Sequence, residues 1–147
     1  MARLMLIINP ISGTGSKKGV VETVEQAMNA CGHDVDVRLT GARGDATRLA
    51  GEAARKGYYG VLACGGDGTV NETARALCST GTALGILPAG SGNGLARHLQ
   101  IPVDISLALK VITADNVVDS DYGTVNGRPF FCTFGLSLIH ISEPTRP

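Results

Sequence analysis

The chain has 147 residues, 44% of them hydrophobic, which is enough to bury the core of one domain. Thirteen Lys and Arg residues balance thirteen Asp and Glu residues, which argues against a surface that binds nucleic acid or an anionic membrane by charge. Glycine is abundant at 20 residues and tryptophan is absent, a composition typical of a compact α/β domain with many tight turns.

Four widely spaced cysteines, Cys31, Cys64, Cys78 and Cys132, form no C-x-x-C pair. They are expected to be small buried residues of a reducing compartment, and no zinc site is expected. The apolar run at 4–8 is too short for a signal-peptide core or a membrane span. The sequence therefore predicts a cytoplasmic protein, whose contact with lipid, if it has one, is peripheral at the inner face of the membrane.

The first part of the chain alternates strand and helix patterns. Residues 4–8 are continuously apolar, as in a central parallel strand, and apolar residues at helical spacing follow over 17–30. Residues 35–40 alternate in polarity, as in a strand near the edge of a sheet. A helix is then expected from about 45 to 56, with Asp45 as its N-cap.

A short apolar run at 61–64 leads into a glycine turn at 65–69 (GGDGT), and a helix is expected behind the turn at 70–77. Strand, glycine turn and helix together point backbone N–H groups at an anion. The carboxylate of Asp67 would repel bare phosphates, so its presence favours a nucleotide bridged by Mg²⁺. The alternative interpretation is that Asp67 caps the helix that follows.

The remaining expected elements are a strand at 83–87, a short helix at 95–99, a helix from 104 to about 114, a strand at 117–125 and a strand at 129–134. Asn126-Gly127 predicts a hairpin turn between the last two strands. Strands that alternate with helices predict a parallel sheet covered by helices on both faces. Ligands bind such sheets at the carboxyl ends of the strands, where polar glycine loops follow three of them, at 9–13, 65–69 and 90–93.

These three loops match a known family in order and spacing. Asn9-Pro10-x-Ser12-Gly13, the GGDGT turn and the loop at 88–93 (PAGSGN) resemble the diacylglycerol kinase catalytic domain family, over residues 3–135. A Walker A loop and a complete G-x-G-x-x-G fingerprint are absent. The resemblance implies an α/β fold in which residues 1–135 form a parallel-sheet nucleotide-binding domain, followed in the family by a C-terminal β domain.

The resemblance also implies a chemistry, transfer of the γ-phosphoryl group of ATP to a lipid hydroxyl such as that of diacylglycerol, with ATP and Mg²⁺ as cofactors. The residues that it implies for nucleotide binding are Asn9, Pro10, Ser12, Gly13, Thr40, Gly65, Gly66, Asp67, Gly68, Thr69, Asn71, Glu72, Gly90, Ser91, Gly92 and Asn93. Asp67 is expected near the metal. Asp121 is a second metal and catalytic candidate, because it begins an Asp-x-Gly sequence like that of the bacterial branch.

Structural roles for several of these residues stay open. Asn9-Pro10 could be an ordinary turn at the end of a strand, and Asn93 could fix its own loop. Asp121 could pair with a neighbouring cation, and Glu72 could support the first turn of its helix.

Two rival functions remain. NAD kinases share the Gly-Gly-Asp-Gly turn, although the PAGSGN loop favours a lipid kinase. A non-catalytic nucleotide-binding module is the other rival, because the chain offers no clear general base for the acceptor hydroxyl.

The tail at 136–147 resembles translated sequencing-adapter sequence and is expected to be non-native. The polypeptide would then be the nucleotide-binding half of a larger kinase, inactive by itself. Peripheral membrane contact would belong to the missing part, no nucleic-acid partner is expected, and a homodimer stays open.

Overall fold

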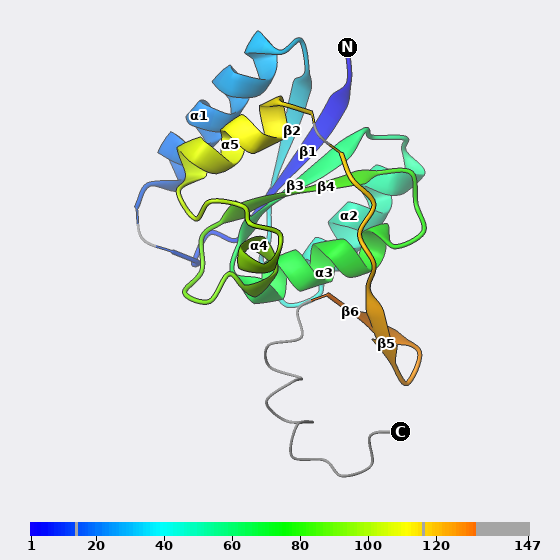
Figure 1. Ribbon diagram of the computed structural model, residues 1–147. Helices are drawn as coiled ribbons and strands as arrows, with labels where there is room; N and C mark the ends of the chain where they lie inside the picture. Colours follow the sequence, from blue (N-terminus) through cyan, green and yellow to red (C-terminus); the bar gives the residue numbers. More distant parts are fainter. Residues whose placement is uncertain (14, 116, 132–147) are drawn as a thin grey trace.

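The computed structural model describes residues 1–13, 15–115 and 117–131. Its main sheet has four parallel strands in the order β2-β1-β3-β4, and a separate hairpin joins β5 to β6 (Figure 1). The strands are β1 (Arg3–Ile8), β2 (Asp34–Leu39), β3 (Gly60–Gly65), β4 (Ala83–Pro88), β5 (Gly123–Val125) and β6 (Arg128–Phe130). The helices are α1 (Lys17–Ala30), α2 (Asp45–Arg55), α3 (Asp67–Leu77), α4 (Gly94–His98) and α5 (Ile105–Thr113).

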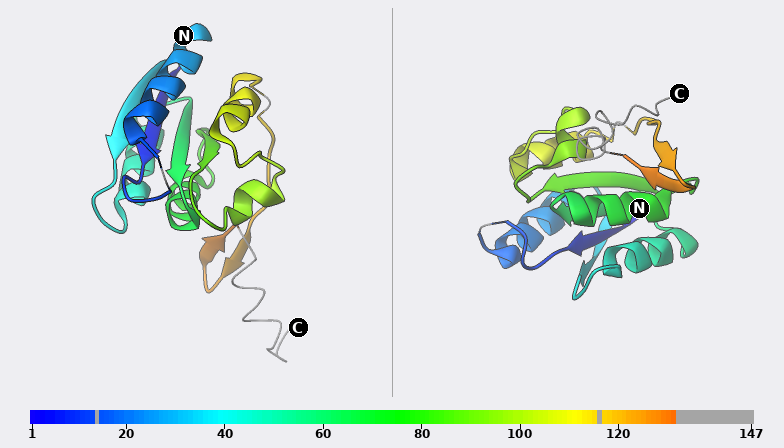
Figure 2. Two further views of the ribbon diagram at one scale, coloured as in Figure 1. Left: turned by 90° about the vertical axis from the view of Figure 1, so that its left-hand side faces the viewer. Right: turned by 90° about the horizontal axis from the view of Figure 1, so that it is seen from below.

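Helices cover both faces of the main sheet, as the sequence predicts (Figure 2). Side chains of β1 alternate between the two faces. Leu4 and Leu6 pack with residues of α1 and α5, whereas Met5 and Ile7 pack with residues of α2 and α3. All six residues of β3 are buried, which explains why its sequence is a continuous run of small and apolar residues.

The predicted edge position of β2 is confirmed, and so is the end of α1. Gly32 has a φ of 80° directly after the C-cap of α1, and the N–H of His33 donates to the carbonyl of Met28. This arrangement is typical of a glycine-terminated helix. The prediction that the cysteines are buried is correct for Cys64 but wrong for Cys31, which is exposed at the end of the helix.

Two helix starts differ from the prediction. The N-cap of α2 is Gly44, not Asp45, because the Asp45 carboxylate bonds backbone N–H groups of the preceding loop. The helix α3 begins at Asp67, so the last three residues of the GGDGT sequence belong to its first turn. The backbone N–H groups of that turn therefore have no partner within the helix and are available to a ligand.

The end of the described chain forms less strand than expected. The hairpin turn at Asn126-Gly127 is confirmed, with both residues at positive φ, but strand pairing begins only at Gly123. Residues 117–122 pair with no strand among the described residues, so they lack the partner that a strand requires. The predicted continuation to residue 134, Cys132 and the tail at 136–147 lie outside the described residues.

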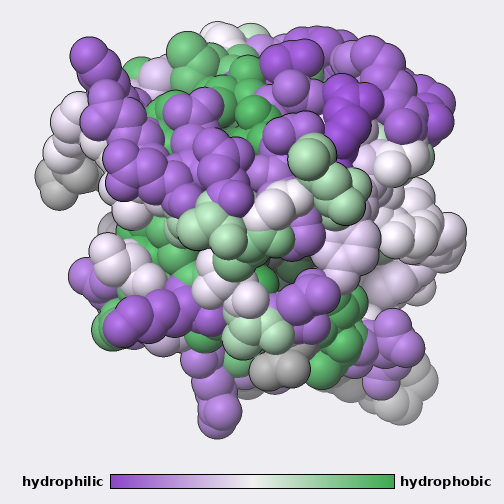
Figure 3. Space-filling model, turned by 90° about the horizontal axis from the view of Figure 1, so that it is seen from above, coloured by the Kyte–Doolittle hydropathy of each residue, from purple (hydrophilic) through white to green (hydrophobic). Residues whose placement is uncertain are grey.

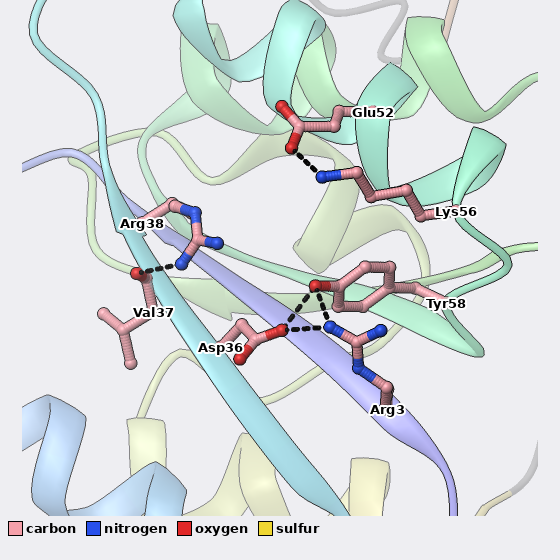
Figure 4. Close-up of polar contacts among 7 residues, drawn as sticks. All are labelled: Arg3, Asp36, Val37, Arg38, Glu52, Lys56 and Tyr58. Carbon is pink, nitrogen blue, oxygen red and sulfur yellow. Dashed lines mark hydrogen bonds and ion pairs between the residues drawn. The ribbon is translucent and has the colours of Figure 1, made fainter.

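A polar network connects residues near the amino ends of the strands (Figure 4). Arg3 donates to the carboxylate of Asp36 at 2.9 Å and to the hydroxyl of Tyr58 at 2.7 Å, and the Tyr58 hydroxyl also bonds Asp36. The Tyr58 hydroxyl and then Arg3 hold the pKa of Asp36 below its ordinary value. Hydrophilic side chains cover much of the surface at this end, with apolar patches between them (Figure 3). The three predicted glycine loops lie at the opposite, carboxyl ends of the strands, where ligands bind parallel sheets.

Candidate functional site

Four segments meet at the carboxyl ends of the parallel strands: the first loop (9–13, after β1), the β2–α2 loop (40–44), the second loop (65–69, from the last residue of β3 to the first turn of α3) and the third loop (90–93, after β4). The backbones of three of them touch. A Cβ atom on Gly90 would lie 2.4 Å from the Cα atom of Gly66, and one on Gly13 would lie 2.6 Å from the carbonyl oxygen of Ala89. Glycine is therefore required at Gly90 and Gly13 by close approach, and the predicted convergence is confirmed.

A pocket of about 330 Å³ opens between the first loop, the β2–α2 loop and the start of α3. Its lining residues are Asn9, Pro10, Ile11, Thr40, Gly41, Ala42, Arg43, Gly68, Thr69 and Glu72. The pocket joins the N–H groups of a helix N-terminus, which favour an anion, to the exposed Arg43, and it also contains the carboxylate of Glu72.

The first loop is held by its own polar groups. The Asn9 side chain accepts from the N–H of Ile11 at 3.1 Å, and the hydroxyl of Ser12 donates to the Asn9 carbonyl at 3.0 Å. The ammonium group of Lys17 donates to the carbonyl of Ser12. The alternative interpretation of Asn9-Pro10 as a strand-ending turn is thus correct for the local bonding, while both residues also line the pocket.

The β2–α2 loop is closed by two carboxylates. Asp45 accepts from the N–H groups of Gly41 at 2.7 Å and Ala42 at 2.9 Å, and these two bonds hold its pKa below the ordinary value. Glu72 of α3 accepts from the N–H of Gly44 at 3.1 Å. One carboxylate shapes the loop from within, and the other attaches it to α3.

Asp67 links the second loop to the third. One carboxylate oxygen, Oδ1, accepts from the N–H of Gly94, the first residue of α4, at 2.7 Å. The other, Oδ2, lies so close to Gly92 that a Cβ atom there would be 2.6 Å away. Asp67 therefore bonds the start of α4, whereas its own helix α3 has no side-chain cap. The alternative interpretation, in which Asp67 caps its own helix, is therefore wrong.

The residues around Asp67 fit a Mg²⁺ ion held jointly with a nucleotide. Among the described residues, no group of three or more His, Cys, Asp or Glu side chains could hold a metal. Magnesium is commonly bound through one or two carboxylates together with substrate phosphates and water. Asp67 can supply one carboxylate of that kind through Oδ2, because only Oδ1 bonds Gly94.

The third loop is held by hydrogen bonds from its own side chains. The side chain of Asn93 accepts from the N–H of Gly90 at 3.0 Å and donates to its carbonyl at 2.8 Å, while the Asn93 backbone has a φ of 53°. Arg97 also donates to the carbonyl of Gly92 at 2.8 Å. Asn93 thus fixes its own loop, as the alternative interpretation proposes.

The pocket contains only part of the predicted nucleotide-binding set. The predicted residues that line it are Asn9, Pro10, Thr40, Gly68, Thr69 and Glu72. The predicted residues that lie outside its lining are Ser12, Gly13, Gly65, Gly66, Asp67, Asn71, Gly90, Ser91, Gly92 and Asn93. Ile11 lies within the predicted loop at 9–13, whereas sequence reasoning missed Gly41, Ala42 and Arg43. Their position directly after an expected parallel strand was the signal that could have found them.

Asp121 lies apart from this pocket. It is exposed and lines a larger cavity of about 720 Å³ along β4, which is lined mainly by apolar side chains. The structure therefore does not place Asp121 with the residues of the candidate site, and its metal role stays a prediction. The larger cavity contains none of the glycine-loop residues, so we take the smaller pocket as the candidate site.

The fold and the site together define an α/β protein whose glycine loops meet at one edge of a parallel sheet, and comparisons with known proteins make this more specific. The family model "Diacylglycerol kinase catalytic domain" matches residues 3–125. The chain therefore belongs to the diacylglycerol kinase catalytic domain family.

Individual relatives agree with this assignment. "Probable lipid kinase YegS-like" of Cronobacter sakazakii is 37% identical over 125 residues, which are 82% of this chain and 42% of that protein. "Diacylglycerol kinase" of Bacillus subtilis is 36% identical over 137 residues, 88% of this chain and 44% of that protein. A crystal structure of a diacylglycerol kinase from Bacillus anthracis superposes with a TM-score of 0.80 at 31% identity, covering 88% of this chain and 44% of that one.

The chain thus spans less than half the length of these relatives. Within the described residues, no helix combines the length and apolar character needed to cross a membrane.

Proposed function

We propose that this chain is the nucleotide-binding part of an ATP- and Mg²⁺-dependent lipid kinase, whose acceptor is the hydroxyl group of diacylglycerol or a related lipid. The observation that carries the proposal is the 330 Å³ pocket, where a helix N-terminus, an arginine and the predicted residues Thr40 and Thr69 meet. Membership of the diacylglycerol kinase family supports the reaction class and the lipid acceptor.

Each part of the pocket has a role in this proposal. The N–H groups of the first turn of α3, at Gly68 and Thr69, would donate to phosphate oxygens, and Arg43 would offset part of their charge. The first loop and Thr40 would form the walls that orient the rest of the nucleotide. Asp67 would hold Mg²⁺, which neutralises charge on the β- and γ-phosphates when bound.

Glu72 is the carboxylate residue among those that line the pocket, and it accepts a hydrogen bond from the N–H of Gly44. We propose that the base, the lipid surface and any peripheral membrane contact are supplied by further sequence of a longer kinase, and that the present chain is inactive alone. The share of its relatives that the chain covers, 42% and 44%, supports this view.

The test is a kinase assay on the longest protein that the gene encodes, with labelled ATP, Mg²⁺ and mixed micelles that contain diacylglycerol, a sphingoid base or no lipid. We expect a labelled phospholipid that requires both Mg²⁺ and lipid, and none from the 147-residue chain alone. Transfer to NAD in place of lipid would favour an NAD kinase. ATP binding without transfer to any acceptor would favour a non-catalytic module.

A further inference from the structure

The β2–α2 loop forms one whole wall of the candidate pocket, yet its residues are mostly exposed and its sequence contains two glycines. A free loop of this kind would sample many conformations, and ordering it on ligand binding would cost conformational entropy. Asp45 bonds two N–H groups within the loop, and a further contact that attaches the loop to the rest of the fold would lower this cost.

Glu72 supplies that attachment from the opposite side of the pocket. Its carboxylate accepts from the N–H of Gly44 at 3.1 Å, and its backbone carbonyl accepts from the hydroxyl of Thr47 at 3.1 Å. The first contact joins α3 to the loop across 28 positions of sequence. The second joins α3 to the first turn of α2 across 25 positions. A single residue of α3 thus fixes the loop and the start of the helix that follows it.

The charge on Glu72 argues against direct contact with a phosphate. A carboxylate that lines an anion pocket repels the ligand, and the hydrogen bond from Gly44 offsets this only in part. The hydrogen bond itself needs an acceptor oxygen but no negative charge, and a Gln side chain provides one.

We propose that Glu72 is a positioning residue, which holds the β2–α2 loop against α3 and so pre-forms the wall of the nucleotide pocket that Thr40 and Arg43 line. The inference rests on the proposed nucleotide site and changes the role of Glu72 from a nucleotide contact to a support of the loop. Nucleotide affinity then depends on the fraction of molecules whose loop is in place.

The experiment measures Mg-ATP binding to the 147-residue chain by calorimetry, with thermal melting as the control for folding. Glu72→Ala should weaken binding roughly five- to tenfold, because the loop loses a hydrogen bond to a charged group and is ordered in fewer molecules. Glu72→Gln should bind Mg-ATP as tightly as the unchanged chain or about twofold more tightly, since it keeps the acceptor and removes a repulsive charge.

Two further variants separate positioning from ligand contact. Thr47 does not line the pocket, and Thr47→Val removes its hydrogen bond to the Glu72 carbonyl. This change should weaken Mg-ATP binding about two- to threefold, as expected for the loss of a neutral hydrogen bond. Glu52→Gln removes an equal charge from the last turn of α2, where the half-buried Glu52 pairs with Lys56 at 2.7 Å outside the pocket lining, and should leave binding unchanged.

Hydrogen exchange gives a direct readout of the wall. The N–H of Gly44 should exchange faster in Glu72→Ala but not in Glu72→Gln, because only the alanine variant lacks an acceptor.

The outcomes are distinguishable. If Glu72→Gln weakens Mg-ATP binding as much as Glu72→Ala while Thr47→Val has no effect, Glu72 touches the ligand or its metal and the inference is wrong. If the unchanged chain, folded by its melting curve, binds no Mg-ATP, the proposed nucleotide site itself fails, and the inference fails with it. Should Glu72→Ala not fold, the Gln and Thr47→Val variants still decide between the two roles.

Discussion

Asp67 is expected to have two separable roles, and two substitutions can divide them. Its Oδ1 atom bonds the N–H of Gly94 at 2.7 Å, which ties the second loop to the start of α4, and its Oδ2 atom is the proposed metal ligand. Asp67→Ala removes both roles. Asp67→Asn keeps an oxygen that can accept from Gly94 but removes the charge that a Mg²⁺ ion requires.

The size of each effect follows from this geometry. The bond to Gly94 is short and charge-assisted but only partly buried, so its loss in Asp67→Ala should cost about 1 to 2 kcal/mol of stability. For a domain of this size that free energy corresponds to a melting temperature lower by roughly 3 to 8 °C. Asp67→Asn should lose less than about 1 kcal/mol, because a neutral acceptor replaces a charged one.

The affinity for Mg-ATP, in contrast to the stability, should fall in both variants alike. Opposite charges about 4 Å apart near a protein surface attract by about 4 kcal/mol before desolvation is subtracted. Even a third of that is about tenfold in affinity, so Asp67→Asn and Asp67→Ala should both weaken Mg-ATP binding by roughly tenfold or more.

The assay pairs thermal melting with calorimetric titration of Mg-ATP, and Asp104→Ala serves as the control. Asp104 caps α5 through a bond to the N–H of Leu107 at 3.0 Å and does not line the candidate pocket, so its loss should cost about 1 kcal/mol without changing ATP affinity. Unchanged Mg-ATP binding in Asp67→Asn would refute the metal role and leave Asp67 as a support of α4 alone.

Three other changes test separate features. Gly90→Ala should cost about 1 to 3 kcal/mol, because the new Cβ atom meets the backbone of the second loop at 2.4 Å, while Gly81→Ala, with nothing within 4 Å, should be near neutral in the same urea titration. The lowered pKa of Asp45 means that its stabilising effect is present above its ordinary value of 3.8 and is lost as the pH falls through the folded-state value. Asp45→Asn should therefore flatten the stability profile below about pH 4, and an unchanged profile would contradict this. Tyr58→Phe removes the hydroxyl that bonds Asp36, so the pKa of Asp36 should rise toward its ordinary value in an NMR titration; a constant pKa would show that the bond is not formed in solution.

The sheet and its helices could be predicted from sequence because their signals are local. The run at 61–64 is apolar without interruption, which burial on both faces requires, and it became the central strand β3. Helical spacing over 17–30 matches the bounds of α1, and Gly32, which supplies a positive φ directly after the C-cap, marks its C-terminal end.

What the sequence could not predict depends on partners that are distant in the chain. An Asp before a helix can bond forward as a cap or backward into its loop, and nothing local revealed that Asp45 bonds backward. The attachment of the β2–α2 loop depends on Glu72, 28 positions after Gly44. Propensity favoured a strand at 117–125, but residues 117–122 pair with no strand among those described.

The place of β1 in the sheet has a consequence for how the chain folds during synthesis. β1 lies between β2, which soon follows it in the chain, and β3, whose Gly60 pairs with Leu4 across 56 positions (60 minus 4). The unit of β1, α1 and β2 can form early, but the other edge of β1 stays unpaired until β3 has left the ribosome. A chaperone that recognises apolar extended segments would have its binding site on this nascent edge, and it would lose that site once β3 is in place.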